Sequence, residues 1–276
     1  MNSFWVRVAI MAAVLAHALA ATPAGATESP SYAAYSQGRY LTALKLAEEE
    51  AAQGSKEAFT LMGEIYAEGL GVAQDFSKAA DAYAKAADLG DANAQFSLGL
   101  MVAEGVGVKK DPRIAADLFE RSAQSGNPAA QYNLALIYVQ GKGRPTDEVK
   151  AAEWMQKAAE QGNPQAQYDL GAFYQFGRGV PIDKAKAAEW TGRAADGGLP
   201  EAQVEYGVML FKGQGVAVDE GRAAKLFRLA AEQGNPAVRD RAREKQQPRS
   251  KLLPPQPILP RRGGPTTVGS CFTAHA

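Results

Sequence analysis

Few side chains in this chain could carry out acid–base, nucleophilic or metal chemistry. Its two histidines are His17 and His275, and its single cysteine is Cys271, all close to the ends. The long middle section therefore lacks the imidazole or thiol that a Ser-His-Asp or Cys-His arrangement needs. A zinc ion would have to be held by carboxylates alone, which is an improbable ligand set. We predict no catalytic residue, no bound metal and no cofactor.

The most regular acidic residues are five aspartates spaced 36 residues apart. They are Asp75, Asp111, Asp147, Asp183 and Asp219. An aspartate that precedes a helix accepts hydrogen bonds from the unpaired N–H groups of the first turn. Pro112 follows Asp111 at the first helical position, where no amide hydrogen is needed. We interpret these aspartates as structural helix caps.

Five pairs of glycines look superficially like phosphate-binding loops. The pairs are Gly69/Gly71, Gly105/Gly107, Gly141/Gly143, Gly177/Gly179 and Gly213/Gly215. A phosphate-binding loop follows a strand and has a tighter glycine pattern. These pairs instead follow a helical pattern, and glycine readily takes the left-handed conformation that ends a helix. We predict structural turns.

These residues are positioned by a repeat of 36 residues. Its anchor is an alanine, followed four and eight residues later by larger apolar side chains that share one face of a helix. A second helix carries alanine doublets seven residues apart, which allow close helix packing. The anchors are Ala58, Ala94, Ala130, Ala166 and Ala202. A fixed period of this length predicts a stacked array of helix hairpins.

One unit shows the pattern most completely. It carries Tyr168, Leu170, Gly171, Tyr174, Gly177, Gly179, Val180, Asp183, Ala187, Ala188, Trp190, Ala194, Ala195 and Gly198. This pattern resembles Sel1-like repeats, the longer-loop relatives of tetratricopeptide repeats, over about residues 58–238. The resemblance implies an all-α fold, a right-handed α-solenoid of helix-turn-helix repeats. It also implies a non-catalytic protein–protein interaction scaffold of the cell envelope, in exopolysaccharide or envelope assembly or in signalling, with a protein or peptide partner.

The pattern divides the chain into a leader, an array and a tail. Arg7 followed by an apolar stretch predicts a signal peptide over 1–26, cut after Ala26, with Ala20 as second choice and a retained anchor as an alternative. From this signal peptide we predict that the protein is periplasmic or secreted. The remaining segments are an N-terminal capping half-repeat (27–57), repeats 1–5 (58–93, 94–129, 130–165, 166–201 and 202–237), a truncated sixth repeat (238–247) and a proline-rich tail (248–276).

Six prolines between residues 248 and 265 exclude a helix in the tail. We expect it to be disordered. Two alternatives stay open. A change of reading frame near residue 244 could have removed a true sixth repeat, or apolar tail residues could fold back over the end of the array.

Charge and cysteine content limit the classes of partner. Lys+Arg and Asp+Glu are both 30, and loss of the leader leaves 29 against 30. A nearly neutral chain has no general electrostatic attraction to nucleic acid or to an anionic membrane. We therefore predict that the protein binds no nucleic acid and, after cleavage of the leader, no membrane. Some exported Sel1-like proteins with cysteine-stapled repeats have been linked to penicillin binding or β-lactam hydrolysis. This chain lacks those cysteines. A β-lactam or cell-wall hydrolase and a self-associating structural protein remain the alternatives.

The predicted partner-binding surface lies on the first helix of each unit. Positions two, six and nine after the anchor point away from the main apolar face, yet several are apolar. The aromatic members either pack between repeats or line a concave wall. The candidate residues are Phe96, Tyr132 and Tyr168, with Gln95, Gln131, Gln167, Gln203, Asn133, Asp169 and Glu205 as possible hydrogen-bonding groups.

Overall fold

The structure, a computed structural model, describes residues 29–234 and 236–246. The predicted leader, Asn235 and the proline-rich tail lie outside these residues. Within them the chain forms thirteen helices and no β-strand. The helices are α2 (Pro30–Ser36), α3 (Tyr40–Ala52), α4 (Lys56–Glu68), α5 (Phe76–Asp88), α6 (Ala92–Glu104), α7 (Pro112–Gln124), α8 (Pro128–Gln140), α9 (Glu148–Glu160), α10 (Pro164–Phe176), α11 (Lys184–Asp196), α12 (Pro200–Lys212), α13 (Glu220–Gln233) and α14 (Pro236–Gln246).

Five similar helix hairpins stack along the chain, so the fold is the all-α solenoid that the repeat predicts. The hairpins are α4–α5, α6–α7, α8–α9, α10–α11 and α12–α13. The shorter pair α2–α3 precedes them, and α14 packs on α12 and α13 at the other end. Each helix contacts its neighbours in sequence, which makes the array nearly one-dimensional.

Local signals set the ends of each helix. The five repeated aspartates all accept hydrogen bonds from first-turn N–H groups; Asp183, for example, accepts from Ala185 and Lys186, each at 3.0 Å. The same interaction lowers the pKa of Asp147, chiefly through the N–H of Lys150. Each first helix of a repeat ends at a left-handed glycine, such as Gly177 with φ of 70°. Helix starts and stops are therefore encoded residue by residue.

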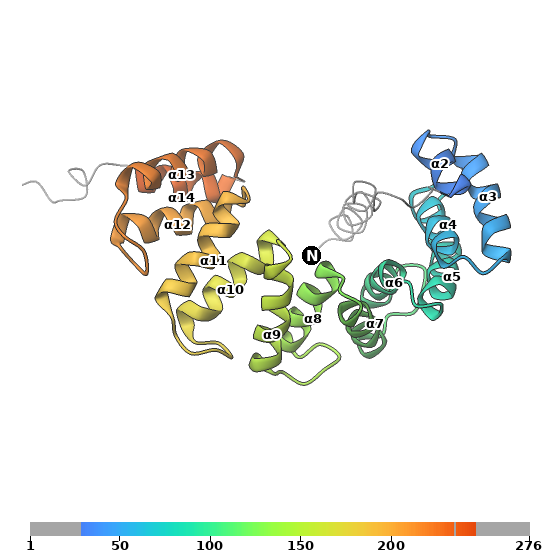
Figure 1. Cartoon of the computed structure of the whole chain (residues 1–276), viewed down its shortest axis with the longest axis horizontal. Helices are drawn as coiled ribbons and strands as arrows, with labels where there is room; N and C mark the ends of the chain where they lie inside the picture. Colours follow the sequence, from blue (N-terminus) through green and yellow to red (C-terminus); the bar gives the residue numbers. More distant parts are fainter. Residues whose placement is uncertain (1–28, 235, 247–276) are drawn as a thin grey trace, which may run out of the picture.

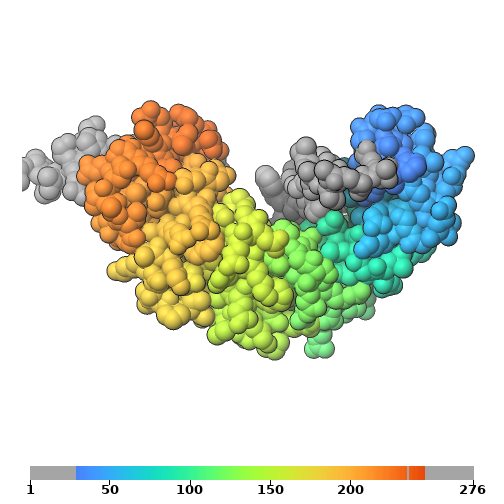
Figure 2. Space-filling view, viewed as in Figure 1, coloured from blue at the N-terminus to red at the C-terminus, as the bar shows by residue number. Residues whose placement is uncertain are grey.

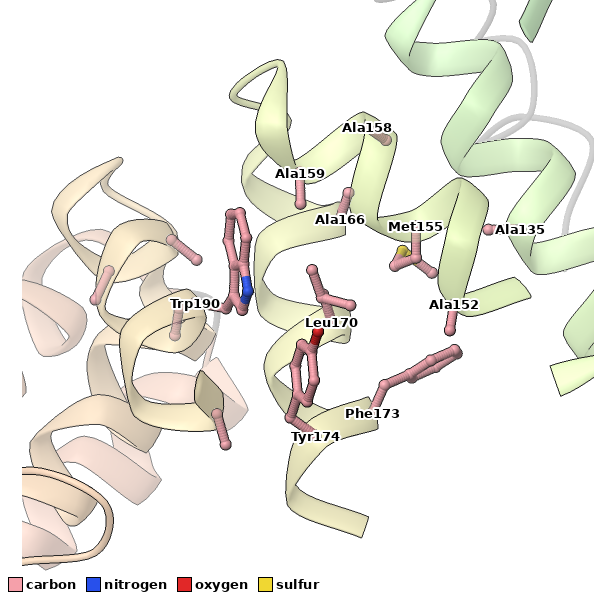
Figure 3. Packing of buried hydrophobic residues seen from close by; sticks show 14 of the residues in the cluster. Ala135, Ala152, Met155, Ala158, Ala159, Ala166, Leu170, Phe173, Tyr174 and Trp190 are labelled. Atoms are coloured by element: carbon pink, nitrogen blue, oxygen red, sulfur yellow. The ribbon is translucent and has the colours of Figure 1, made fainter. Parts of the chain in front are cut away.

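Small residues allow the helices to approach closely. The alanine doublets of α9 are fully or almost fully buried. Figure 3 shows Ala152, Ala158 and Ala159 in one cluster with larger side chains, such as Met155, Phe173 and Trp190. In three repeats a glycine of the first helix lies against an aromatic ring of the second: Gly63 against Tyr83, Gly99 against Phe119 and Gly207 against Phe227. A Cβ atom on Gly63 would lie 2.6 Å from the Tyr83 ring. Packing, rather than disulfide bonds, holds the described array together.

The loop of each repeat rests on the preceding repeat. A side chain at Gly179 would collide with the backbone carbonyl of Glu148, the first residue of α9. Next to this contact, Arg178 Nε donates to Glu148 Oε1 at 3.2 Å. Because Gly179 also has φ of 65°, glycine meets both a conformational and a steric requirement at this point.

The stacked hairpins form a crescent whose hollow lies between its two ends (Figures 1 and 2). Some first helices of consecutive units contact one another directly, as α4 does with α6 and α12 with α14. In Figure 1, α6 lies on the inner side of α7. We therefore describe the side formed by the first helices as the inner face. None of the described helices is long and apolar enough to cross a membrane.

Candidate functional site: a pocket on the inner face

A pocket opens on the inner face between the first helices of the fourth and fifth repeats. Its volume is about 200 Å³. Four lining residues belong to α10 and one to α12, while the remaining one comes from α11. They are Tyr168, Ala172, Gln175, Phe176, Glu205 and Thr191, which we call the α10–α12 pocket. It includes positions two, six and nine of the fourth repeat, so these positions of α10 form a surface.

The pocket occurs where the repeat has a smaller residue than usual. Position 191 corresponds to large side chains in every other repeat: Tyr83, Phe119, Met155 and Phe227. Tyr83 and Phe119 pack over the glycines Gly63 and Gly99, and Phe227 packs over Gly207. In the fourth repeat the glycine is retained as Gly171, but the large partner is Thr191. Thr191 thus lines the pocket at a position where the other repeats carry a large side chain.

The polar groups at the pocket differ from those one repeat earlier. Tyr132 of α8 donates from its hydroxyl to Asp169 Oδ2 of α10 at 2.9 Å. Tyr168 stands in the equivalent position relative to Glu205, but Arg241 Nη2 binds Glu205 Oε2 at 2.7 Å. The Tyr168 hydroxyl makes no hydrogen bond to any residue that the structure describes. The fourth repeat therefore presents a phenol group that is free to bind a partner.

Burial and nearby charge act on these groups. Desolvation raises the pKa of Tyr132 and of Tyr168, and the carboxylates of Asp169 and Glu205 add to the effect. Burial also raises the pKa of Asp169, against the hydrogen bonds from Tyr132 and Gln165. At neutral pH both phenols carry their protons. Tyr168 can consequently donate one hydrogen bond and accept others.

The side chains of Phe96 and Asn133 make contacts within the array. Phe96 is only 3% exposed, and its ring lies 5.8 Å from that of Phe119. Asn133 Nδ2 donates to the Ala129 carbonyl at 2.8 Å on its own helix. Packing between helices therefore explains Phe96, whereas Tyr132 and Tyr168 remain half-buried on the inner face.

The four predicted glutamines are buried in the turns between repeats. Each side-chain Nε2 donates a hydrogen bond to a backbone carbonyl near the end of the preceding helix, at 3.1 to 3.5 Å. Gln167, for example, donates to the carbonyl of Ala159. Each of these carbonyls lies at the end of a helix and also accepts from a backbone N–H of the turn, as Ala159 does from Gly162 at 3.0 Å, so the glutamine adds a second hydrogen bond. This structural role leaves them unavailable as ligands for a partner backbone. The glutamines are Gln95, Gln131, Gln167 and Gln203.

Sequence reasoning missed Gln175, Phe176, Thr191 and Arg241. Comparing the second helices position by position would have found Thr191, because it is the smallest residue at its position. Phe176 is 66% exposed at the rim of the pocket, and nothing in the sequence pattern indicates that exposure. Among the described residues, no group of histidine, cysteine or acidic side chains could hold a metal ion.

Comparisons with known proteins give a consistent result. The sequence model described as Sel1 repeat matches residues 57–91, 92–127, 128–163, 164–199 and 200–235. A Sel1 repeat protein from Oxalobacter formigenes is 30% identical, with a TM-score of 0.72, over 78% of this chain and 88% of that one. The antigen c5321, described as protective and present in uropathogenic Escherichia coli strains and displaying an SLR fold, is 32% identical, also with a TM-score of 0.72. That match covers 88% of this chain and 51% of c5321. Among curated proteins no sequence matches significantly.

Proposed function

Because the chain belongs to the Sel1 repeat family, we propose that it is a non-catalytic scaffold of the cell envelope that binds a peptide segment of a partner protein along its inner face. Sel1 repeat proteins are generally protein–protein interaction scaffolds. We assign the α10–α12 pocket as the anchor point for that segment. The partner's backbone would run along the inner face, and one of its side chains would enter the pocket.

The observation that carries this proposal is the loss of side-chain volume at Thr191 beside an unused hydroxyl at Tyr168. A pocket of about 200 Å³ is smaller than the roughly 300–1,000 Å³ of small-molecule sites, but suits one apolar side chain. Ala172 and Phe176 supply apolar surface. Tyr168 and the Gln175 amide supply polar groups at its edge, where an extended backbone needs partners.

The envelope location rests on the N-terminal leader. A basic residue, the apolar stretch from Val8 to Ala20 and the small residues before Ala26 favour export and cleavage. The test is fractionation of cells that produce the full chain, followed by N-terminal sequencing. A periplasmic or secreted product that begins at Thr27 supports this part of the proposal, whereas full-length protein in the cytoplasm contradicts it.

The binding mode can be tested with selected peptides. Random peptides displayed on phage are selected on the cleaved protein, and the affinity of each purified peptide is measured by fluorescence anisotropy. The variant Thr191→Phe introduces the large side chain found at Phe119 and Phe227 to fill the pocket. Because Gly171 lies close to Thr191 Oγ1 and to the α11 backbone, circular dichroism and urea unfolding must show that the fold is retained. We expect selected peptides to bind Thr191→Phe at least tenfold more weakly.

The matched control is Val149→Phe, which adds an aromatic ring at an exposed position of α9, outside the pocket. Its affinity should equal that of the wild type. Equal binding by all three proteins, with unchanged circular dichroism, contradicts the assignment of the pocket.

A further inference from the structure

A carboxylate occupies an inner-face position of the first repeat that is apolar in every other repeat. Glu64 lies six residues after its anchor, Ala58. The same position holds aliphatic side chains elsewhere: Leu100, Leu136, Ala172 and Val208. Glu64 is half-buried and makes neither a hydrogen bond nor an ion pair with any residue that the structure describes. An ionisable group at such a position breaks the packing rule of the repeat, which is typical of a binding site.

Tyrosines and a second carboxylate surround Glu64. Tyr32 and Tyr35 of α2 are half-buried, and their rings meet edge to face with centroids 6.5 Å apart. From α5, Tyr83 lies against Gly63, next to Glu64, and is only 2% exposed. Glu68 follows one turn later on α4. We call Tyr32, Tyr35, Glu64, Glu68 and Tyr83 the acidic tyrosine cluster.

Two polar atoms of this cluster are shut off from water without a partner. They are Tyr83 Oη and Glu68 Oε1, neither of which forms a hydrogen bond of accepted geometry. The Ser97 hydroxyl lies near enough to Tyr83 to lower its pKa, against the larger raising effect of burial. A buried polar atom without a partner is costly, by about 1–3 kcal/mol. The interior of the cluster is therefore polar and incompletely hydrogen-bonded beside Glu64.

The ionisable groups in and around the cluster are all acidic, so any charge that they carry is negative. Burial, Glu68 and Asp91 together raise the pKa of Glu64 to about 8. Burial and the neighbouring carboxylates likewise raise the pKa of Tyr35 to about 12, and Glu57, Glu64 and Asp91 contribute to the raised pKa of Tyr32. Asp91 itself caps α6 through Ala94 N at 2.7 Å. Within the described residues, no lysine or arginine pairs with Glu64 or Glu68.

We infer that the acidic tyrosine cluster binds the cationic side chain of a lysine or arginine carried by the partner segment. This inference extends the proposed function and rests on it only in placing the cation on a peptide. An ammonium or guanidinium group donates hydrogen bonds and accepts none, which matches the carboxylate and phenol oxygens gathered here. The faces of Tyr32 and Tyr35 add cation–π attraction. The described residues provide no metal-binding group as an alternative.

The experiment is an NMR titration of the cleaved protein with a blocked tetralysine peptide at pH 8 and low salt. We expect amide shifts confined to α2, α4, α5 and the start of α6, with saturation. Glu64→Gln should weaken binding at least tenfold. Glu153→Gln, an exposed charge removal of the same size on α9, should leave the dissociation constant unchanged. Tyr35→Phe, which keeps the ring, provides a second folded variant and should weaken binding severalfold.

Four results overturn the inference. Equal loss in Glu64→Gln and Glu153→Gln would show general charge attraction, and equal binding of an acetyl-lysine tetrapeptide would show that the cation is not recognised. The absence of saturable shifts would remove the site altogether. Spermine is titrated separately, because tighter binding of spermine than of tetralysine at these amides would assign the site to free polyamines instead of a peptide. None of these outcomes depends on the α10–α12 pocket, so this inference and the proposed function fail separately.

Discussion

Replacing Gly179 by alanine tests whether the repeats are locked together through their loops. Gly179 sits in the loop of the fourth repeat, and a Cβ atom there would collide with the Glu148 carbonyl of the third. Gly162 provides a matched control, because its φ is 87° and nothing lies within 4 Å of the position that its Cβ would take. Both substitutions impose the same left-handed backbone on alanine. Only Gly179→Ala also forces two repeats apart.

The expected magnitudes follow from these two effects. A left-handed alanine costs about 1–2 kcal/mol, so Gly162→Ala should lower the free energy of unfolding by that amount. Overpacking at a closely packed contact adds about 1–3 kcal/mol. Gly179→Ala should therefore lose about 2–5 kcal/mol in total. The loss should fall on the interface between the third and fourth repeats, because stability in a solenoid is a sum of repeat and interface contributions.

The assay is urea unfolding of the cleaved protein, followed by circular dichroism at 222 nm and by the fluorescence of Trp154 and Trp190, one in each of the two repeats. A weakened interface should broaden the transition of Gly179→Ala or divide it into two, because long repeat arrays can lose two-state behaviour. Equal midpoints and slopes for Gly179→Ala and Gly162→Ala would refute the reasoning, since the collision would then cost nothing.

Three further predictions concern pH, capping and chemistry. The pKa of Glu64 is about 8 in the folded protein against an ordinary value of 4.5, so the folded state holds a proton that the unfolded chain has lost between these values. Thermal stability should therefore fall as pH rises from 5 to 8, and Glu64→Gln should flatten that slope in calorimetry; an unchanged slope contradicts the burial of this carboxylate. Asn163→Ala should lower the free energy of unfolding by about 0.5–2 kcal/mol, because Asn163 Oδ1 accepts from Ala166 N at 2.9 Å. A loss below 0.3 kcal/mol in urea unfolding would argue against capping at the start of α10. The purified protein should not hydrolyse a chromogenic β-lactam, and turnover above that of a heat-denatured sample would reopen the hydrolase alternative.

Sequence periodicity predicts the array well because each signal acts locally. Asp183 caps α11 and Gly177 ends α10 through their immediate neighbours, so neither position needs knowledge of the rest of the fold. The sequence pattern does not show which side chains form hydrogen bonds between repeats. Gln167 is polar and lies beside the anchor alanine, which suggested a surface group, yet its amide binds the Ala159 carbonyl across the turn. The Ala159 carbonyl, which also accepts from Gly162 N, gives the buried amide a partner that the sequence pattern does not reveal.

The binding surfaces depend on departures from the repeat. Tyr168 belongs to the predicted surface, but the sequence does not reveal that Glu205 is bound by Arg241, from a helix beyond the last full repeat. Thr191 and Glu64 are visible in the sequence as exceptions at their positions. The sequence does not show the structural consequence of each exception. Thr191 lines a pocket, while Glu64 has no hydrogen-bond or ion-pair partner among the described residues.

Site-specific photo-crosslinking in living cells tests the central claim most directly. A photoreactive phenylalanine replaces Gln175 at the edge of the α10–α12 pocket in one strain and Val149 on an exposed part of α9 in another. We predict that position 175 gives a discrete adduct with another polypeptide, that Thr191→Phe abolishes this adduct, and that position 149 gives none. Adducts from position 149 alone, or an adduct at position 175 that persists with Thr191→Phe, would contradict binding through the inner face.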